Sequence, residues 1–319
     1  MTEKQIRVPL HLGRPLRRRA LTPSRTRLTI VLSVVLAAAV AAAVAMGAAA
    51  ARVAAGGPYR NGLVLFTRCC GTPGTGIYVV NPNGSGQQLV YRAKFDDAPL
   101  TPSWSPDGKR IAFTPGVPLG GVWTMRANGT APTRVTAGRG EALFPSWSPA
   151  GKWIAFADRQ SASSGLHDIF RVKLDGTGLK RLTHAVSEET SPAWAPNGAT
   201  IVYDRGRDLW RMKPDGMDQL PLIRNARHAS WSPGGSTIAF VRGGDPWLAA
   251  RDGSKQRRVV HLAQAIVFVT WSPDSRWLVV APMDRGDLTL LRPDGSAAQP
   301  LTHEPDYFHG SPNWQRLPG

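Results

Sequence analysis

Acidic side chains recur in the short segments that precede a repeated tryptophan, and their type and spacing could support chemistry. Carboxylates gathered at one end of a channel can hold a cation, a basic peptide segment or a metal ion. Another such segment is basic, with Arg227 and His228, and His309 lies within the last acidic segment, at 303–312. The same acids could equally form a solvated rim or cap turns. The acidic candidates are Asp96, Asp97, Glu141, Glu188, Glu189, Glu304 and Asp306.

No motif of a known catalytic centre accompanies these residues. The chain has no G-x-S-x-G nucleophile motif, and His303-Glu304 is followed by Pro-Asp-Tyr, which does not complete H-E-x-x-H. The seven histidines show no close ligand spacing. We therefore expect no catalytic residue, no resident metal and no cofactor. The alternative is a metal-dependent lyase or hydrolase, acting on polysaccharide or peptide, whose histidines and carboxylates meet at the channel.

Cys69 and Cys70 are the two cysteines of the chain, and they are adjacent. Consecutive Cα atoms lie about 3.8 Å apart, closer than the usual disulfide span of about 4.4–6.8 Å, so a bond between them would be strained and reducible. Outside the cell, two free thiols would be exposed to oxidation. Either a vicinal disulfide stiffens this loop, or one cysteine bonds to a partner chain. A redox or metal-binding role is the third alternative.

An internal repeat supplies the elements that must position these residues. Ser-Trp-Ser-Pro occurs three times and related forms occur three more times, at intervals of 37 to 47 residues. An Asn-Gly or Asp-Gly pair keeps the same interval. Because one tryptophan falls at the same point of every unit, we expect it to pack between neighbouring sheets. The repeated tryptophans are Trp104, Trp147, Trp194, Trp231, Trp271 and Trp314.

Each repeat has the pattern of four short antiparallel strands joined by tight turns. The first strand holds the tryptophan, and the second is of the type Ile-Ala-Phe at 111–113. The Asn-Gly and Asp-Gly pairs predict type I′ turns, in which both central residues need positive φ. The content of 33 Gly and 27 Pro also fits a turn-rich, all-β chain. Four strands in a period near 42 residues predict a β-propeller blade.

The two ends of the repeated region complete each other. The region opens near Gly62 with the last three strands of a blade, and it closes with a lone first strand at 311–314. Pairing them makes a sixth blade and leaves no open sheet edge. We therefore expect an all-β, six-bladed propeller over residues 62–319. The irregular blade-to-blade crossings, which carry the acidic candidates, would lie on the face opposite the S-P-x-G and Asx-Gly turns, and function is expected there.

The segment from Ser103 to Phe113, S-W-S-P-D-G-K-R-I-A-F, resembles the repeat of the TolB-type β-propeller family, as do the later D-G and R-L-T segments. The resemblance covers residues 62–319 and implies a six-bladed propeller. This repeat occurs in periplasmic TolB, which scaffolds an envelope protein complex. It also occurs in propeller domains of some serine peptidases and in certain polysaccharide lyases. The resemblance therefore specifies the fold more closely than the function.

An uncharged, apolar stretch fills residues 28–51. At 1.5 Å per residue it is long enough for a helix to cross a hydrocarbon core of about 30 Å. Eight basic residues lie before it, within 1–27. The positive-inside rule then predicts a single-pass anchor in the cell membrane, with a cytoplasmic N-terminus, a linker at 52–61 and the propeller outside. The alternative is a signal peptide cleaved near 48–55, which would give a secreted propeller.

The net charge of +17 does not by itself indicate a nucleic-acid partner. Seven of these charges lie in residues 1–27, where they act as the topology signal. The remaining ten lie after that segment, and their arginine excess could in part reflect codon usage. We expect no nucleic-acid partner. The expected function is that of a monomeric, non-catalytic scaffold that binds a cell-envelope protein or peptide through the crossing face.

Overall fold

The computed structural model describes residues 59–70, 74–94, 100–116, 119–137, 141–159 and 165–318. Within these ranges, no helix is long and apolar enough to cross a bilayer. The predicted basic stub, the predicted membrane segment and the linker up to residue 58 lie outside the described residues. So do Asp96 and Asp97.

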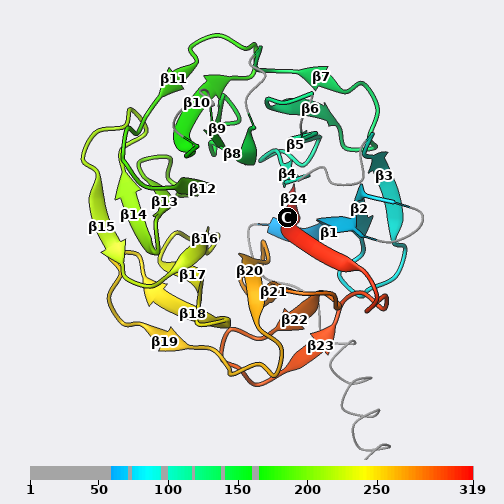
Figure 1. The fold of residues 1–319 in the computed structure, drawn as a ribbon. Helices are drawn as coiled ribbons and strands as arrows, with labels where there is room; N and C mark the ends of the chain where they lie inside the picture. Colours follow the sequence, from blue (N-terminus) through cyan, green and yellow to red (C-terminus); the bar gives the residue numbers. More distant parts are fainter. Residues whose placement is uncertain are drawn as a thin grey trace, which may run out of the picture. The chain divides into compact units, whose positions relative to one another are not determined.

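The described residues form six four-stranded antiparallel sheets, arranged as blades around a central axis (Figure 1). The predicted all-β, six-bladed propeller is therefore confirmed. Blade 1 joins the two ends of the domain, whereas every other blade is built from consecutive strands. Its strands, in spatial order, are β24 (Phe308–Pro318), β1 (Tyr59–Cys69), β2 (Gly76–Val80) and β3 (Gln88–Arg92).

Blades 2 to 6 follow in chain order, and in each the first strand lies nearest the axis (Figure 1). Blade 2 holds β4 (Ser103–Trp104), β5 (Arg110–Phe113), β6 (Trp123–Arg126) and β7 (Thr133–Arg134), and blade 3 holds β8 (Leu143–Trp147), β9 (Trp153–Asp158), β10 (Asp168–Lys173) and β11 (Lys180–Arg181). Blade 4 holds β12 (Glu189–Trp194), β13 (Ile201–Arg205), β14 (Asp208–Met212) and β15 (Leu220–Ile223). Blade 5 holds β16 (Arg227–Trp231), β17 (Thr237–Arg242), β18 (Asp245–Ala250) and β19 (Arg257–Arg258), and blade 6 holds β20 (Ile266–Trp271), β21 (Leu278–Pro282), β22 (Thr289–Leu291) and β23 (Ala298–Pro300).

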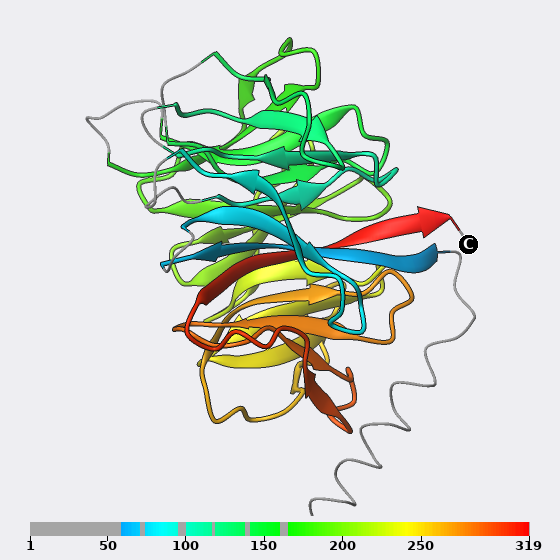
Figure 2. The same cartoon turned by 90° about the vertical axis from the view of Figure 1, so that its right-hand side faces the viewer.

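The strands that close the ring are longer than the sequence predicts. β1 begins at Tyr59, inside the range assigned to the linker, and pairs with β24 from Tyr59↔Pro318 to Cys69↔Phe308. Figure 2 shows the start of β1 and the end of β24 projecting together past the other blades. This pairing satisfies the backbone edges that an open ring would expose.

The hydrophobic core lies between the blades, as the repeated tryptophans predict. One cluster combines Leu65 and Ile77 of blade 1 with Trp104 and Phe113 of blade 2. Four of the repeated tryptophans are at most 9% exposed, and the other two pack partly buried against neighbouring clusters. Each indole therefore packs between neighbouring sheets.

The Asx-Gly turns correct one local prediction. Only the glycine of each pair has positive φ; at Gly84, for example, φ is 82°. Gly84 N–H donates to Asn81 O, and Asn81 N–H donates to Ser85 O. These turns are thus type I followed by a glycine bulge, and not type I′. A Cβ at Gly129 would lie 1.8 Å from Val90 O of the preceding blade, so close packing demands glycine as well.

Part of the arginine excess has a structural use. Arg205 stacks over Trp210 at 4.1 Å, and Arg292 stacks over Trp277 at the same distance. Arg171 lies 4.5 Å from the centroid of Trp153. A guanidinium plane covers an indole face through cation–π attraction and remains partly solvated. These arginines therefore shield strand aromatics, a role that codon usage alone does not explain.

Candidate functional site

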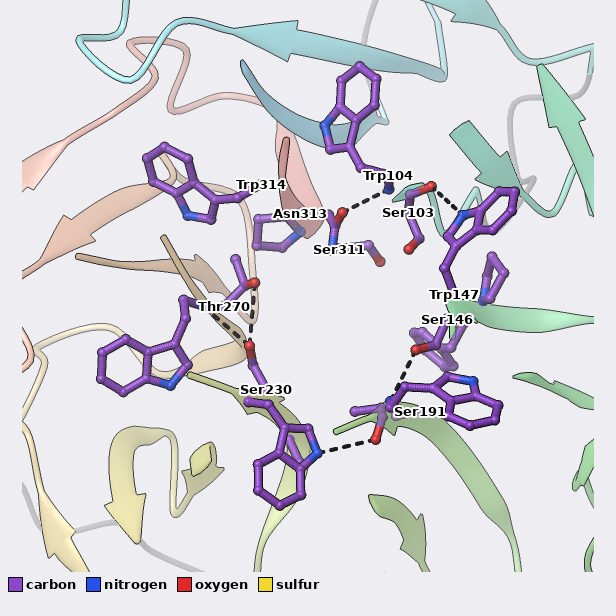
Figure 3. Close-up of a pocket in the computed structure, with 18 of the residues that line it drawn as sticks. Ser103, Trp104, Ser146, Trp147, Ser191, Ser230, Thr270, Ser311, Asn313 and Trp314 are labelled. Carbon is purple, nitrogen blue, oxygen red and sulfur yellow. Dashed lines mark hydrogen bonds between the residues drawn. The ribbon is translucent and has the colours of Figure 1, made fainter. Parts of the chain in front are cut away.

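A central channel of about 250 Å³ is lined by the first strand of every blade. Its wall carries small polar side chains at the position just before each tryptophan, while the indoles point away from the axis (Figure 3). These polar residues are Ser103, Ser146, Ser230, Thr270 and Asn313; Ala193 takes the same position in blade 4.

The polar side chains of the channel wall face the channel and also hold neighbouring blades together. Asn313 Oδ1 accepts the Trp104 backbone N–H of the next blade at 2.8 Å, and Ser230 Oγ accepts that of Trp271 at 3.2 Å. The side chains that line the channel therefore also fasten neighbouring blades. A ligand in the channel would meet hydroxyl and amide groups, which both donate and accept hydrogen bonds.

Three aromatic rings narrow the channel toward the crossing face. Phe144 of blade 3 and Phe268 of blade 6 meet from opposite sides, with ring centroids 6.0 Å apart. His228 of blade 5 lies 4.6 Å from Phe268 and 5.8 Å from Phe144. Phe144 and His228 both have a φ of 53°, at irregularities in the pairing of β8 and β16. These bulges turn the side chains toward the axis.

A buried carboxyl group supports this constriction from behind. Asp204 at the end of β13 is 3% exposed and accepts the backbone N–H of His228 at 3.0 Å. Burial raises the pKa of Asp204 to about 7, although hydrogen bonds from His228 and Ser191 oppose the rise. Burial also lowers the pKa of His228 to about 4, helped by the charge of Arg227. His228 is therefore neutral at physiological pH, while Asp204 titrates near it.

Ser191, His228 and Asp204 together resemble a hydrolytic triad in composition but not in geometry. Ser191 Oγ lies 3.0 Å from His228 Nδ1, and Asp204 Oδ2 lies 3.7 Å from the same nitrogen. A triad needs the serine on one imidazole nitrogen and the carboxylate on the other. The cluster therefore shapes the channel wall, and its geometry does not activate Ser191 as a nucleophile.

Two of the predicted rim acids pair with basic groups around blade 4. Glu189 is fully buried, and its Oε1 accepts from Arg205 Nε at 2.5 Å. Glu188 accepts from Nδ1 of His167 at 2.6 Å. Glu189 thus joins the start of β12 to β13 of the same blade and is not accessible to a ligand. Glu188 remains part of the surface, with its side chain 44% exposed.

Glu141 and Glu304 are paired in the same way. Glu141 bonds to Arg159. Glu304 accepts from Arg68 and Gln87; burial raises its pKa, but these hydrogen bonds hold it below its usual value.

The remaining predicted site residues do not gather at one point. Asp306 is exposed and forms no ion pair within the described part of the chain. Arg227 is exposed and donates to Gly206 O at 2.9 Å. His309 is fully buried, with Nδ1 on Gly286 O at 2.8 Å. Of the predicted site residues within the described ranges, only His228 lines the channel.

The two cysteines are joined to each other. Cys69 at the end of β1 and the exposed Cys70 form a disulfide. Arg285 Nη2 lies 3.4 Å from Cys70 O and connects this end of blade 1 to blade 6. Among the described residues, no group of three or more His, Cys, Asp and Glu side chains is placed to hold a metal ion.

Sequence reasoning missed Ser191 and Phe144 as parts of the channel wall, and Asp204 as the buried carboxyl group behind it. The sequence could have indicated Asp204, because a carboxylate directly after the apolar run Ile-Val-Tyr is expected to be buried and to need a hydrogen-bond partner. No local feature of the sequence indicates the role of Phe144, because its partner Phe268 lies on the opposite side of the propeller.

The comparisons with known proteins agree with this fold. A model of the TolB beta propeller domain matches residues 73–273. The chain belongs to the TolB beta propeller family. No significant match was found among curated proteins.

Solved structures of TolB propellers resemble this chain over most of its length. TolB from Acinetobacter baumannii aligns with a TM-score of 0.69 at 18% identity, covering 81% of this chain and 67% of that one. The putative TolB from Agrobacterium tumefaciens aligns with a TM-score of 0.60 at 19% identity, covering 82% and 100%. An oligogalacturonate lyase in complex with manganese aligns with a TM-score of 0.52 at 12% identity, covering 72% and 71%. At these identities the likeness is evidence of fold alone.

Proposed function

We propose that this TolB-family propeller is a non-catalytic scaffold of the cell envelope that binds an extended protein segment in its central channel. The observation that carries the proposal is the channel itself, a 250 Å³ cavity whose wall is uncharged over most of its length and rich in hydroxyl groups. A peptide backbone alternates donors and acceptors, and serine, threonine and asparagine can pair with both. Arg316 adds one cation to the lining.

The direction of entry follows from the channel lining. The aromatic rings of Phe144, His228 and Phe268 narrow the crossing end. The other end is lined by the prolines of the S-P-x-G turns, among them Pro106 and Pro233. The ligand therefore enters from the turn face and stops against the aromatic rings. The acidic crossing residues, Asp306 above all, would then be a separate contact surface for a protein that reaches around the rim.

The setting of this scaffold is part of the proposal. The apolar stretch at 28–51 would anchor the chain in the cell membrane and leave the propeller outside. The partner would then be an envelope protein, consistent with the family to which the chain belongs. We propose a monomeric propeller and no nucleic-acid ligand.

The test is a selection of linear peptides from a displayed library on the wild-type protein and on two variants. Ala193→Tyr places a bulky ring in the channel at a position whose side chain makes no hydrogen bond, and Asp306→Ala changes the rim. We expect selected peptides to lose binding to Ala193→Tyr and to keep binding to Asp306→Ala. Equal binding to Ala193→Tyr and wild type would refute the channel. Cleavage of polysaccharide or peptide that disappears in His228→Ala would favour the enzyme alternative.

A further inference from the structure

A second, smaller pocket lies between blades 4 and 5, away from the channel axis. Its volume is about 160 Å³. Blade 4 contributes Arg211 of β14 and the turn residues Asn197 and Thr200, while blade 5 contributes Gly234 and Gly235 of its S-P-x-G turn and Arg251 after β18. None of the lining residues is acidic.

Two arginines without a carboxylate partner share this pocket. The side chains of Arg211 and Arg251 are exposed and make no hydrogen bond, ion pair or ring contact with any described residue. Most other arginines of the blade surfaces are occupied: Arg205 binds Glu189, and Arg242 donates to Arg224 O. Like charges that converge without a counterion repel each other, and an anion between them relieves that repulsion.

The neighbouring blade junctions show what is different here. Between blades 3 and 4, Arg171 takes the position that corresponds to Arg211 and donates to Pro214 O at 2.7 Å. Between blades 5 and 6, Arg257 donates to Pro293 O at 2.8 Å. Pro214 and Pro293 each stand directly before an Asp-Gly turn, and in blade 5 that place is taken by Arg251. Arg211 makes no corresponding bond, so the N–H groups of the Arg211 and Arg251 side chains remain available to donate to a ligand.

The S-P-x-G turns of this junction also lack the acid found at the same position in blades 2 and 6. Asp107 in blade 2 and Asp274 in blade 6 occupy the third position of the turn, whereas blades 4 and 5 have Asn197 and Gly234 there. Asn197 Oδ1 accepts the Ala199 N–H at 3.0 Å, which leaves its amide N–H groups to donate. A Cβ at Gly234 would meet nothing within 4 Å, so the space beside the turn is open.

We propose that this pocket binds the phosphate group of a ligand through Arg211 and Arg251. The planar donor forks of two arginines match the oxygens of a phosphate, and the amide of Asn197 and the hydroxyl of Thr200 add neutral donors. Two sources carry this group: soluble phosphate or its esters, and the headgroup of an anionic phospholipid. This site is separate from the channel and stands whether or not the channel binds a peptide.

The first arm of the test measures soluble phosphate. Purified full-length protein is titrated with inorganic phosphate by calorimetry at constant ionic strength, with chloride as the balancing anion. We expect saturable binding that weakens about tenfold in Arg211→Gln and in Arg251→Gln, because each removes one charge-assisted donor fork. Arg207→Gln is the matched control, since Arg207 is also exposed, its side chain contacts no partner among the described residues, and it lies outside the pocket. Arg207→Gln should bind like wild type.

The second arm measures binding to vesicles of phosphatidylglycerol in phosphatidylcholine, against phosphatidylcholine alone. A phosphatidylglycerol-dependent shift that Arg211→Gln reduces and Arg207→Gln preserves assigns the site to a headgroup, even where inorganic phosphate binds weakly. Absence of both signals overturns the proposal. Equal losses in Arg211→Gln and Arg207→Gln also overturn it, because they would report net charge only. Unchanged thermal melting of the variants ensures that a loss of binding is not a loss of fold.

Discussion

At the face of the S-P-x-G and Asx-Gly turns the same hydrogen bonds recur from blade to blade, whereas the ion pairs of the acidic side chains at the crossing face differ from one blade to the next. On the turn face, Ser148 Oγ accepts the Trp153 N–H, and Ser272 Oγ accepts the Trp277 N–H in the same way. On the crossing face, Glu189 pairs with Arg205 inside one blade, while Glu304 joins Arg68 across the closure. Repetition therefore marks what builds the ring.

The ion pairs of the crossing face contribute to stability, and breaking a buried one should cause the largest loss of unfolding free energy. Glu189→Ala leaves the Arg205 guanidinium, whose side chain is only 16% exposed, without its counterion. Removing one partner of a buried pair costs about 3–5 kcal/mol of unfolding free energy. Urea denaturation of the variant measures it. A Glu189→Leu, Arg205→Met double variant should recover much of the loss; a double variant as unstable as the single one would contradict this account.

The close packing of the turn face can be tested by comparing Gly129 of an Asx-Gly turn with Gly206, which lies in the β13–β14 loop at the crossing face. Gly129 and Gly206 have φ values of 81° and 60°, so alanine is strained at both, by about 1–2 kcal/mol. At Gly206 a Cβ would meet nothing within 4 Å, whereas at Gly129 it would lie 1.8 Å from Val90 O of the preceding blade. We expect Gly129→Ala to lose ~1–3 kcal/mol more than Gly206→Ala, because the neighbouring backbone must move. Equal losses in denaturant melts would show that repeated close packing is unimportant.

The two faces also differ in how they hold carboxylates. On the turn face, the hydrogen bond from Thr177 lowers the pKa of Asp175. At the crossing end of the channel, burial raises the pKa of Asp204 to about 7. An acid with a raised folded pKa binds more protons when folded, so its contribution to stability is fully present below its ordinary pKa of 3.8 and is lost progressively as the pH rises from there through about 7.

Replacing Asp204 by Asn should therefore change the pH profile of stability. His228, with its pKa lowered to about 4, acts in the opposite direction between that pH and 6.5, so the effect of Asp204 stands out above pH 6.5. Wild type should lose about 1–3 °C of melting temperature between about pH 6.5 and 8, because less than about 1 kcal/mol of the Asp204 contribution is lost in that interval and each kcal/mol corresponds to about 2–4 °C. Asp204→Asn should lose less. Parallel profiles of the two proteins would mean that Asp204 does not titrate in this range.

The repeated contacts are also those that the sequence could predict. Trp104 and its five counterparts, with the Asx-Gly pairs, define the blade because each unit must bury the same face against its neighbour. The channel wall could not be predicted in the same way, because Phe144, His228 and Phe268 come from three different blades and meet only when the ring of blades closes. Glu189 was recognised as an acid of a crossing, but its burial depends on the β12–β13 register that faces it with Arg205. The sequence therefore shows which residue types occur in the crossings, but it does not show which side chains they contact in the folded ring.

The Cys69–Cys70 disulfide should have the smallest effect on stability, although it lies at the closure of the ring. A cross-link restricts the unfolded chain according to the length of the loop it closes, and two adjacent residues close almost none. Reduction should therefore cost at most about 1 kcal/mol of unfolding free energy, measured in urea with and without a dithiol reductant. Cys69→Ser, Cys70→Ser protein should match the reduced wild type. A loss as large as that of Glu189→Ala would mean that this bond positions β1 against β24 directly, and the individual contacts of the crossing face would then include a covalent one.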